Sequence, residues 1–133
     1  MKLKAMIMEF NENIEEEILV LVNDSFLLNT FYLASSPNLF PLSEGTEYNV
    51  EISIVILYNT EIEQIKENKK TIEQDGKSFK HYIYGKLDVE QLMIKSIIDV
   101  PLEKEYIFDY SFCDQKYIKM KIDMFNIEFL SYY

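Results

Sequence analysis

The sequence predicts an all-β protein, and three observations support that prediction. Residues 47–58 alternate between polar and apolar side chains with a period of two, which gives a strand one wet and one buried face. Similar short segments recur along the 133 residues, separated by turn-forming residues. Hydrophobic residues make up 48% of the chain, enough to build a core. We expect one domain over residues 1–133. Its fold would be a mainly antiparallel Greek-key barrel or two-sheet sandwich, with a barrel of OB type as the first choice, because these architectures limit exposed sheet edges.

The N-terminal third predicts three strands, at residues 2–10, 14–22 and 26–34. The pair Asn23-Asp24 predicts a turn between the second and third strands. Residues 18–22 are continuously apolar, which is typical of a strand covered on both faces. A loop should follow at residues 35–41, where serines, an asparagine and two prolines gather.

The middle of the chain is ambiguous. Thr60 and Glu63 have the spacing of a capping box, which predicts one short helix near residues 61–68. The pair Asp75-Gly76 predicts a hairpin turn after residues 71–74. Residues 88–100 can be read as either helix or strand, and the strand is favoured.

The last third predicts three consecutive antiparallel strands at residues 106–112, 117–122 and 125–129. Each segment alternates apolar and polar side chains, and residues 113–115 form the first turn between them. Brief connections of this kind imply a meander.

The sequence contains no motif for an enzyme, a cofactor or a metal site. A single cysteine rules out a disulfide framework and a cysteine-based zinc site, and three glycines are too few for a phosphate-binding loop. His81, the only histidine, falls on the apolar side of its segment and is expected to be structural. Cys113 adjoins Asp114, and a neighbouring carboxylate opposes thiolate formation.

No targeting segment is recognisable, so the expected location is the cytoplasm. The longest apolar run spans residues 18–22, far short of the ~18 residues that a membrane span needs.

Negative charge is concentrated at the start of the chain. Residues 1–65 hold two lysines and eleven carboxylates, residues 66–86 carry a net +3, and the rest carry −4, for a total of −10. Such a surface steers association with a basic partner, as an inhibitor or immunity protein would need, although the same charge can serve only solubility. The residues expected to form this partner-binding surface are Glu15, Glu16, Glu17, Asp24, Glu44, Glu47 and Glu51.

A second candidate surface combines tyrosines and lysines. If the strands near residues 80–87 and 117–122 adjoin, one sheet face would carry Lys80, Tyr82, Tyr84, Lys86, Tyr117, Lys119 and Lys121. This face could hold single-stranded nucleic acid or a small ligand, form protein contacts, or be a solvated sheet surface. The net charge and the complete lack of arginine disfavour nucleic acid. A third class, a barrel that carries a ligand among its many aromatic side chains, is not distinguishable from a packed core.

Overall fold

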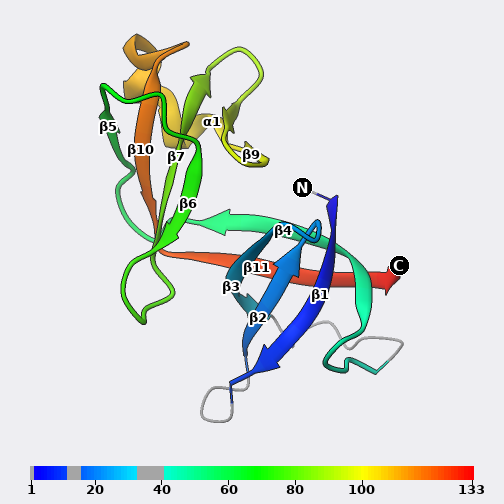
Figure 1. Cartoon of the computed structure of the whole chain (residues 1–133). Coiled ribbons are helices and arrows are strands. Elements are labelled where there is room, and N and C mark those ends of the chain that lie inside the picture. Colours follow the sequence, from blue (N-terminus) through cyan, green and yellow to red (C-terminus); the bar gives the residue numbers. More distant parts are fainter. Residues whose placement is uncertain (1, 12–15, 33–40) are drawn as a thin grey trace. The chain divides into compact units, whose positions relative to one another are not determined.

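The computed structural model describes residues 2–11, 16–32 and 41–133, which fold into two compact units (Figure 1). The barrel unit comprises residues 1–53 and 125–133, and the sheet unit comprises residues 54–124. Strands dominate both units, so the predicted all-β class is confirmed. The expectation of one domain stays a prediction. Over the described ranges, no helix is long and apolar enough to cross a membrane.

The barrel unit is a closed five-stranded barrel, so the barrel prediction is confirmed. Its strands follow the order β1-β2-β3-β11-β4, and β4 pairs back with β1. Pairs β1–β2, β2–β3 and β1–β4 are antiparallel, whereas β3 and β11 are parallel. The strands are β1 (Lys2–Phe10), β2 (Glu17–Val22), β3 (Phe26–Tyr32), β4 (Glu47–Val55) and β11 (Met124–Tyr132).

Alternation along the strands builds the barrel core. On β4, Tyr48, Val50 and Ile52 are fully buried, as their spacing predicts. The predicted turn between β2 and β3 is confirmed, since Asn23 and Asp24 have φ angles of 50° and 57°. Two consecutive left-handed residues fit the tight hairpin turns that asparagine and aspartate tolerate.

Tyr48 also ties the segment before β4 to the barrel. Its hydroxyl accepts a hydrogen bond from the Ser43 backbone N–H at 2.9 Å and donates one to the Pro41 carbonyl at 3.2 Å. Its ring packs edge-on against Phe129, with the centroids 5.2 Å apart, and stacks with Tyr132 at 5.5 Å. One buried side chain thus joins β4, β11 and the preceding loop.

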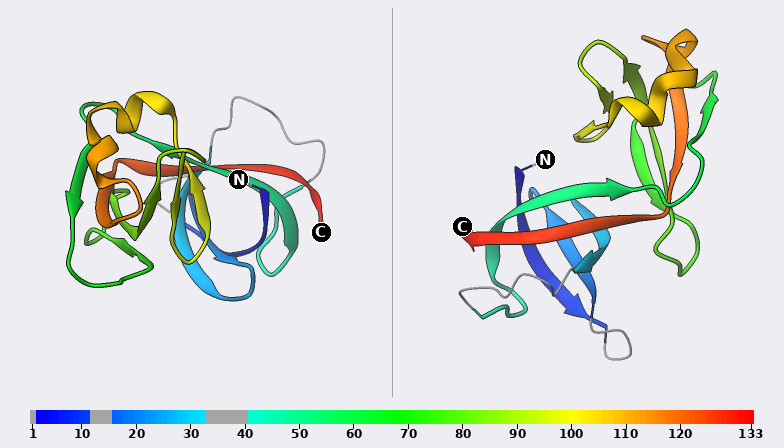
Figure 2. Two further views of the ribbon diagram at one scale, coloured as in Figure 1. Left: turned by 90° about the horizontal axis from the view of Figure 1, so that it is seen from above. Right: turned by 180° about the vertical axis from the view of Figure 1, so that it is seen from behind.

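The sheet unit holds a six-stranded sheet with the path β5-β10-β7-β8-β9, and β6 pairs with β7 off this path. A helical segment crosses over this sheet (Figure 2), and its Ile107 and Cys113 are buried. The elements are β5 (Glu61–Gln64), β6 (Thr71–Gln74), β7 (His81–Asp88), β8 (Met93–Lys95), β9 (Asp99–Pro101), α1 (Lys104–Ile107), the 3-10 helix η1 (Phe108–Cys113) and β10 (Tyr117–Ile122). The hairpin predicted around Asp75-Gly76 is confirmed as the antiparallel pair β6–β7.

The helix predicted near residues 61–68 is wrong. Residues 61–64 form β5, whose Ile62 lies opposite Met120 on β10. Pairing with the edge of β10 therefore overrides the local capping signal of Thr60 and Glu63.

The strand predicted at residues 106–112 is also wrong, because α1 and η1 occupy these positions. Phe108 and Phe112 are 76% and 69% exposed, so the aromatic alternation does not mark a buried face. The predicted meander fails with it. Strand β10 pairs with β5 and β7 in the sheet unit, whereas β11 joins the barrel.

Residues 88–100 form strands, as favoured, but in two pieces. Strands β8 and β9 make a hairpin in which Ile94 lies opposite Val100. A turn precedes β8, where Leu92 has φ 53° and the Asp88 carboxylate accepts the Gln91 N–H at 2.9 Å. The single long strand is thus interrupted by residues 89–92 and again by residues 96–98, and its apolar pattern does not reveal either turn.

Candidate functional site

The strands that carry the predicted tyrosines and lysines are neighbours. Strands β7 and β10 pair antiparallel, with Tyr84 opposite Lys119, Tyr82 opposite Lys121 and Lys86 opposite Tyr117. Directly opposite residues share a face, so these six side chains form one surface, which we call the Tyr–Lys face. Lys80 precedes β7 and borders a small hollow of about 130 Å³ together with Lys121.

Lysine ammonium groups cover two tyrosine rings of this face, those of Tyr82 and Tyr84. The Lys119 Nζ lies 4.4 Å from the Tyr82 ring centroid, and the Lys69 Nζ lies 4.0 Å from that of Tyr84. The Lys121 Nζ is 5.8 Å from the Tyr82 centroid. These distances fit cation–π contacts. A base that stacks on Tyr82 or Tyr84 would therefore have to displace a lysine from that ring.

Carboxylates also lie along the Tyr–Lys face and reduce its positive potential. Glu61 and Glu63 of β5 lie opposite Lys121 and Lys119, and Glu73 of β6 pairs with Lys69 at 2.9 Å. That ion pair raises the Lys69 pKa. A second pair joins Lys95 and Asp88 at 3.5 Å. Lys119, Lys121 and Lys69 thus have carboxylate neighbours within their own unit, which disfavours a polyanion.

A hollow of about 460 Å³ opens beside these residues, where β5 borders β10. Sequence reasoning missed the contribution of β5 because Glu61 and Glu63 were assigned to a helix. Their period-two spacing around Ile62 was the available signal. The hollow is lined by Thr60, Glu61, Ile62, Glu63, Tyr82, Tyr110, Lys119 and Lys121.

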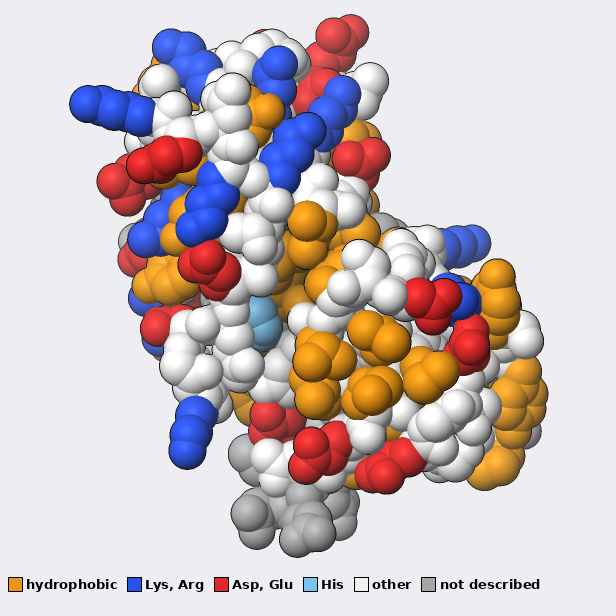
Figure 3. Space-filling view, in the orientation of Figure 1, with side chains coloured by type: hydrophobic (Ala, Val, Ile, Leu, Met, Phe, Trp, Pro, Cys, Tyr) orange, Lys and Arg blue, Asp and Glu red, His pale blue; other side chains and the backbone are white. Residues whose placement is uncertain are grey.

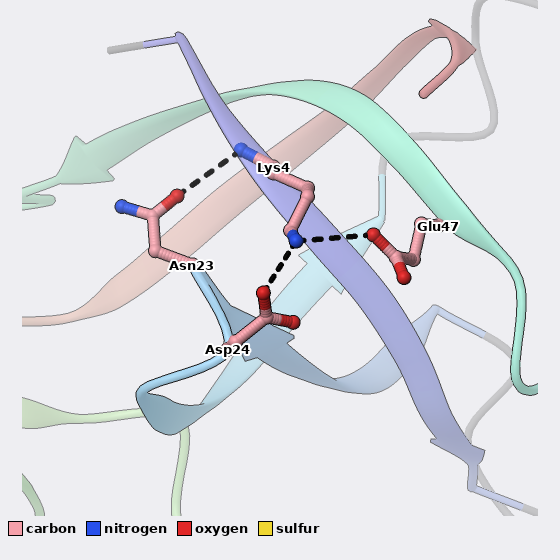
Figure 4. Close-up of polar contacts among 4 residues, drawn as sticks. All are labelled: Lys4, Asn23, Asp24 and Glu47. Atoms are coloured by element: carbon pink, nitrogen blue, oxygen red, sulfur yellow. Dashed lines mark hydrogen bonds and ion pairs between the residues drawn. The ribbon is translucent and has the colours of Figure 1, made fainter.

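The predicted acidic surface lies on the barrel unit, but as two groups. The first group, Asp24, Glu47 and Glu51, lies along the first half of β1. Figure 4 shows the Lys4 ammonium between the Asp24 and Glu47 carboxylates, and these bonds raise the Lys4 pKa, Asp24 contributing most. Glu51 lies opposite Lys2 in the β1–β4 register.

The second group, Glu16, Glu17 and Glu44, lies near the far end of β1. The Glu17 carboxylate accepts hydrogen bonds from the side-chain amides of Asn11 at 2.7 Å and Asn29 at 2.6 Å, so it has a structural role. Glu44 is exposed and accepts a long bond of 3.4 Å from the Phe10 N–H. Glu15 lies outside the described residues.

Charge is unequal between the two units. The barrel unit holds two lysines and ten carboxylates, a net charge of −8, whereas the sheet unit holds eleven lysines and thirteen carboxylates, a net charge of −2. Carboxylates therefore outnumber lysines by eight in the barrel unit.

The two residues with candidate nucleophile or base chemistry are buried. His81 is 2% exposed, and its Nδ1 lies 2.7 Å from the Phe79 carbonyl. Burial lowers the His81 pKa and raises that of the Cys113 thiol. His81 thus faces the core as predicted. The described parts of the chain contain no group of three His, Cys, Asp or Glu side chains placed to hold a metal ion.

Comparison with known proteins identifies a family. No curated protein and no solved structure matches the chain. One family model matches residues 1–130, nearly the whole sequence. The chain therefore belongs to the family described as "Uncharacterised conserved protein UCP019853".

Proposed function

We propose that this protein is a small acidic protein-binding module that acts on a basic partner, in the manner of an inhibitor or immunity protein. One observation carries the proposal: a net charge of −8 resides in the barrel unit, with ten carboxylates against two lysines. Charge segregated in this way accelerates encounter with a cationic surface and makes binding depend on salt.

The barrel architecture supports this proposal. Numbered by their order in the chain, the five barrel strands follow one another around the barrel as first, second, third, fifth and fourth. We assign this order to the OB type. OB barrels use the outer surface of the second and third strands as a binding platform. These are β2 and β3 here, and they lie between the two acidic groups.

The test compares two double charge reversals of equal net charge. One variant combines Glu16→Lys with Glu44→Lys on the barrel unit, and the control combines Glu90→Lys with Asp99→Lys on the sheet unit, where both side chains are exposed. Each variant has a formal net charge of −6, given −10 for the wild type. Partners are captured from source-cell lysate with nuclease added, and association rates with each purified partner are measured at low salt. We expect a basic partner whose association slows only with the barrel variant. Equal rates for all three proteins would refute the proposal.

A second candidate function rests on the pairing of β7 with β10, which assembles the Tyr–Lys face. This face would hold single-stranded nucleic acid or a small ligand. The test measures fluorescence anisotropy of a labelled oligothymidine with Tyr82→Ala/Tyr84→Ala. Tyr58→Ala is the control, because Tyr58 is an 89% exposed tyrosine of the same unit. Binding lost only in the double variant would favour this function, and no binding by the wild type would exclude nucleic acid.

A further inference from the structure

The outer surface of the barrel carries an apolar patch that spans three strands. Leu21 of β2 lies opposite Met6 of β1 and Leu27 of β3. Leu19 is the outward-facing residue of β2 that precedes Leu21. Met8 lies on β1 at the position where the β1–β2 register shifts. Met8 and Leu27 are 43% and 57% exposed, respectively. We call these five residues the Met–Leu face. Figure 3 shows hydrophobic side chains gathered on this side of the barrel, with acidic side chains along the border.

The Met–Leu face explains an anomaly in the sequence. Residues 18–22 are apolar at every position, which predicts burial on both sides. The barrel core covers only Ile18, Val20 and Val22, and leaves Leu19 and Leu21 half-buried on the outside. Strand β4 of the same barrel instead alternates buried residues with outward Glu47, Asn49 and Glu51. Contiguous exposed apolar surface of this kind marks interaction sites.

The two acidic groups lie at opposite ends of the Met–Leu face. Asp24 and Glu47 lie beside Lys4 in the first half of β1, whereas Glu17 and Glu44 are bonded to Asn11 and Phe10 at its end. Lys4 and Phe10 are six residues apart, about 20 Å along a strand. A second copy of this chain would bring the same carboxylates against one another. Charge complementarity therefore favours a cationic partner with an apolar centre.

The closed barrel determines how such a partner can dock. Strands β1 and β2, which carry four of the five residues, each pair on both sides, so the partner cannot add a strand beside them. Strand β3 pairs with β11 at Phe31 and Tyr32. The acidic groups lie about 20 Å apart along the strands, which leaves room between them for one α-helix of about 10–12 Å diameter. A helix lying across the strands would place its apolar stripe on the Met–Leu face and the cations of its two flanks toward the two acidic groups. Methionine side chains adapt readily to such a surface.

We propose that the Met–Leu face binds an amphipathic, cationic helix of the partner; this inference rests on the proposed function and specifies the chemistry of its partner. The probe is a synthetic leucine–lysine peptide of about five helical turns with its leucines on one face. A second peptide of identical composition has the leucines dispersed. Anisotropy at low salt measures the affinity of each peptide for the full chain.

Two variants remove apolar contacts, Leu27→Ser and Met8→Gln. Leu57→Ser is the matched control, because Leu57 is a 60% exposed leucine of the sheet unit. We expect the amphipathic peptide to bind more tightly than its isomer, and each barrel variant to lose about tenfold in affinity, the effect of removing one partly buried apolar side chain. Leu57→Ser should bind like the wild type. Thermal unfolding verifies that every variant is folded.

Different results separate the two proposals. Equal affinity for both peptides, or unchanged binding by both barrel variants, overturns the helix-binding inference. The proposed function would then still stand if the Glu16→Lys/Glu44→Lys variant slows capture of a basic partner, and would fail if that variant has no effect. Concentration-dependent dimerisation that Leu27→Ser abolishes would also overturn the inference and assign the face to a second copy.

Discussion

Gly85 lies where strand β7 comes close to the end of strand β8, and replacing it should weaken the sheet unit. A Cβ atom built on Gly85 would lie 2.5 Å from the Lys95 carbonyl oxygen and 2.8 Å from the Ile94 Cγ2. An ordinary carbon–oxygen contact is about 3.3 Å, so β8 would have to move by about 0.8 Å. Such a shift strains the short β7–β8 ladder, in which Lys86 lies opposite Lys95. Overpacking costs about 1–3 kcal/mol, and we expect Gly85→Ala to reach about 2–3 kcal/mol because the obstacle is backbone.

The other two glycines provide a control with a different mechanism. Gly45 and Gly76 have φ angles of +78° and +60°, and a Cβ at either would meet nothing within 4 Å. Alanine there should cost about 1–2 kcal/mol from the left-handed backbone alone, and asparagine less, because it tolerates that region. At Gly85 the larger asparagine should instead be worse than alanine.

Urea unfolding followed by tyrosine fluorescence measures these free energies, since the chain has ten tyrosines and no tryptophan. A Gly85→Ala variant within about 0.5 kcal/mol of the wild type, the range of ordinary surface changes, would refute the steric argument. So would an asparagine at position 85 that destabilises less than alanine.

Three further predictions concern single side chains. Tyr48→Phe leaves the Ser43 N–H without its hydroxyl acceptor and should lower the urea unfolding free energy by about 1–3 kcal/mol; an unchanged value would mean that another acceptor replaces it. Burial lowers the His81 pKa below its usual 6.5, so the unfolded chain takes up this proton first, and stability should fall as the pH drops below 6.5. His81→Phe should lack this component between pH 7.5 and pH 5, and parallel pH profiles of the two proteins would contradict it. Lys4→Gln removes a partly exposed cation from two carboxylates, so it should change the melting temperature little and should speed association with a basic partner at low salt; slower association would count against an acidic docking surface.

The sequence predicts strand β4 well because polar and apolar residues alternate along it. In β4, Tyr48, Val50 and Ile52 alternate with polar residues, and the structure buries all three. The Asn23-Asp24 turn was equally readable, because left-handed φ angles need residues of this kind. Local patterns of this sort do not encode the partner of each strand, so the apparent meander of the last third was misassigned.

Errors concentrate where tertiary contacts decide between similar local signals. Residues 61–64 carry a capping-box pattern, yet β10 offers them a free edge. The aromatic residues 106–112 have high β-propensity, yet burial of Ile107 and Cys113 anchors a helical segment instead. The sequence predicts the Tyr–Lys face only on the condition that its two strands pair with each other. The structure pairs them as β7 and β10. The Met–Leu face escaped notice because a continuous apolar strand predicts complete burial, not one open side.

The two candidate surfaces differ in how much of their charge is matched within their own unit. On the Tyr–Lys face, lysines lie over tyrosine rings or beside carboxylates, and the sheet unit as a whole is only two charges from neutrality. Ligand binding there must break existing contacts, and little net charge is left to attract an ion from a distance. On the barrel unit, ten carboxylates share two lysines, so a cationic partner gains electrostatic attraction from carboxylates in excess of the internal ion pairs that Lys4 makes with Asp24 and Glu47. Binding at the barrel should therefore weaken steeply with added salt, whereas binding at the Tyr–Lys face should depend on salt much less. The slope of affinity against ionic strength thus distinguishes the two surfaces even before a partner is identified.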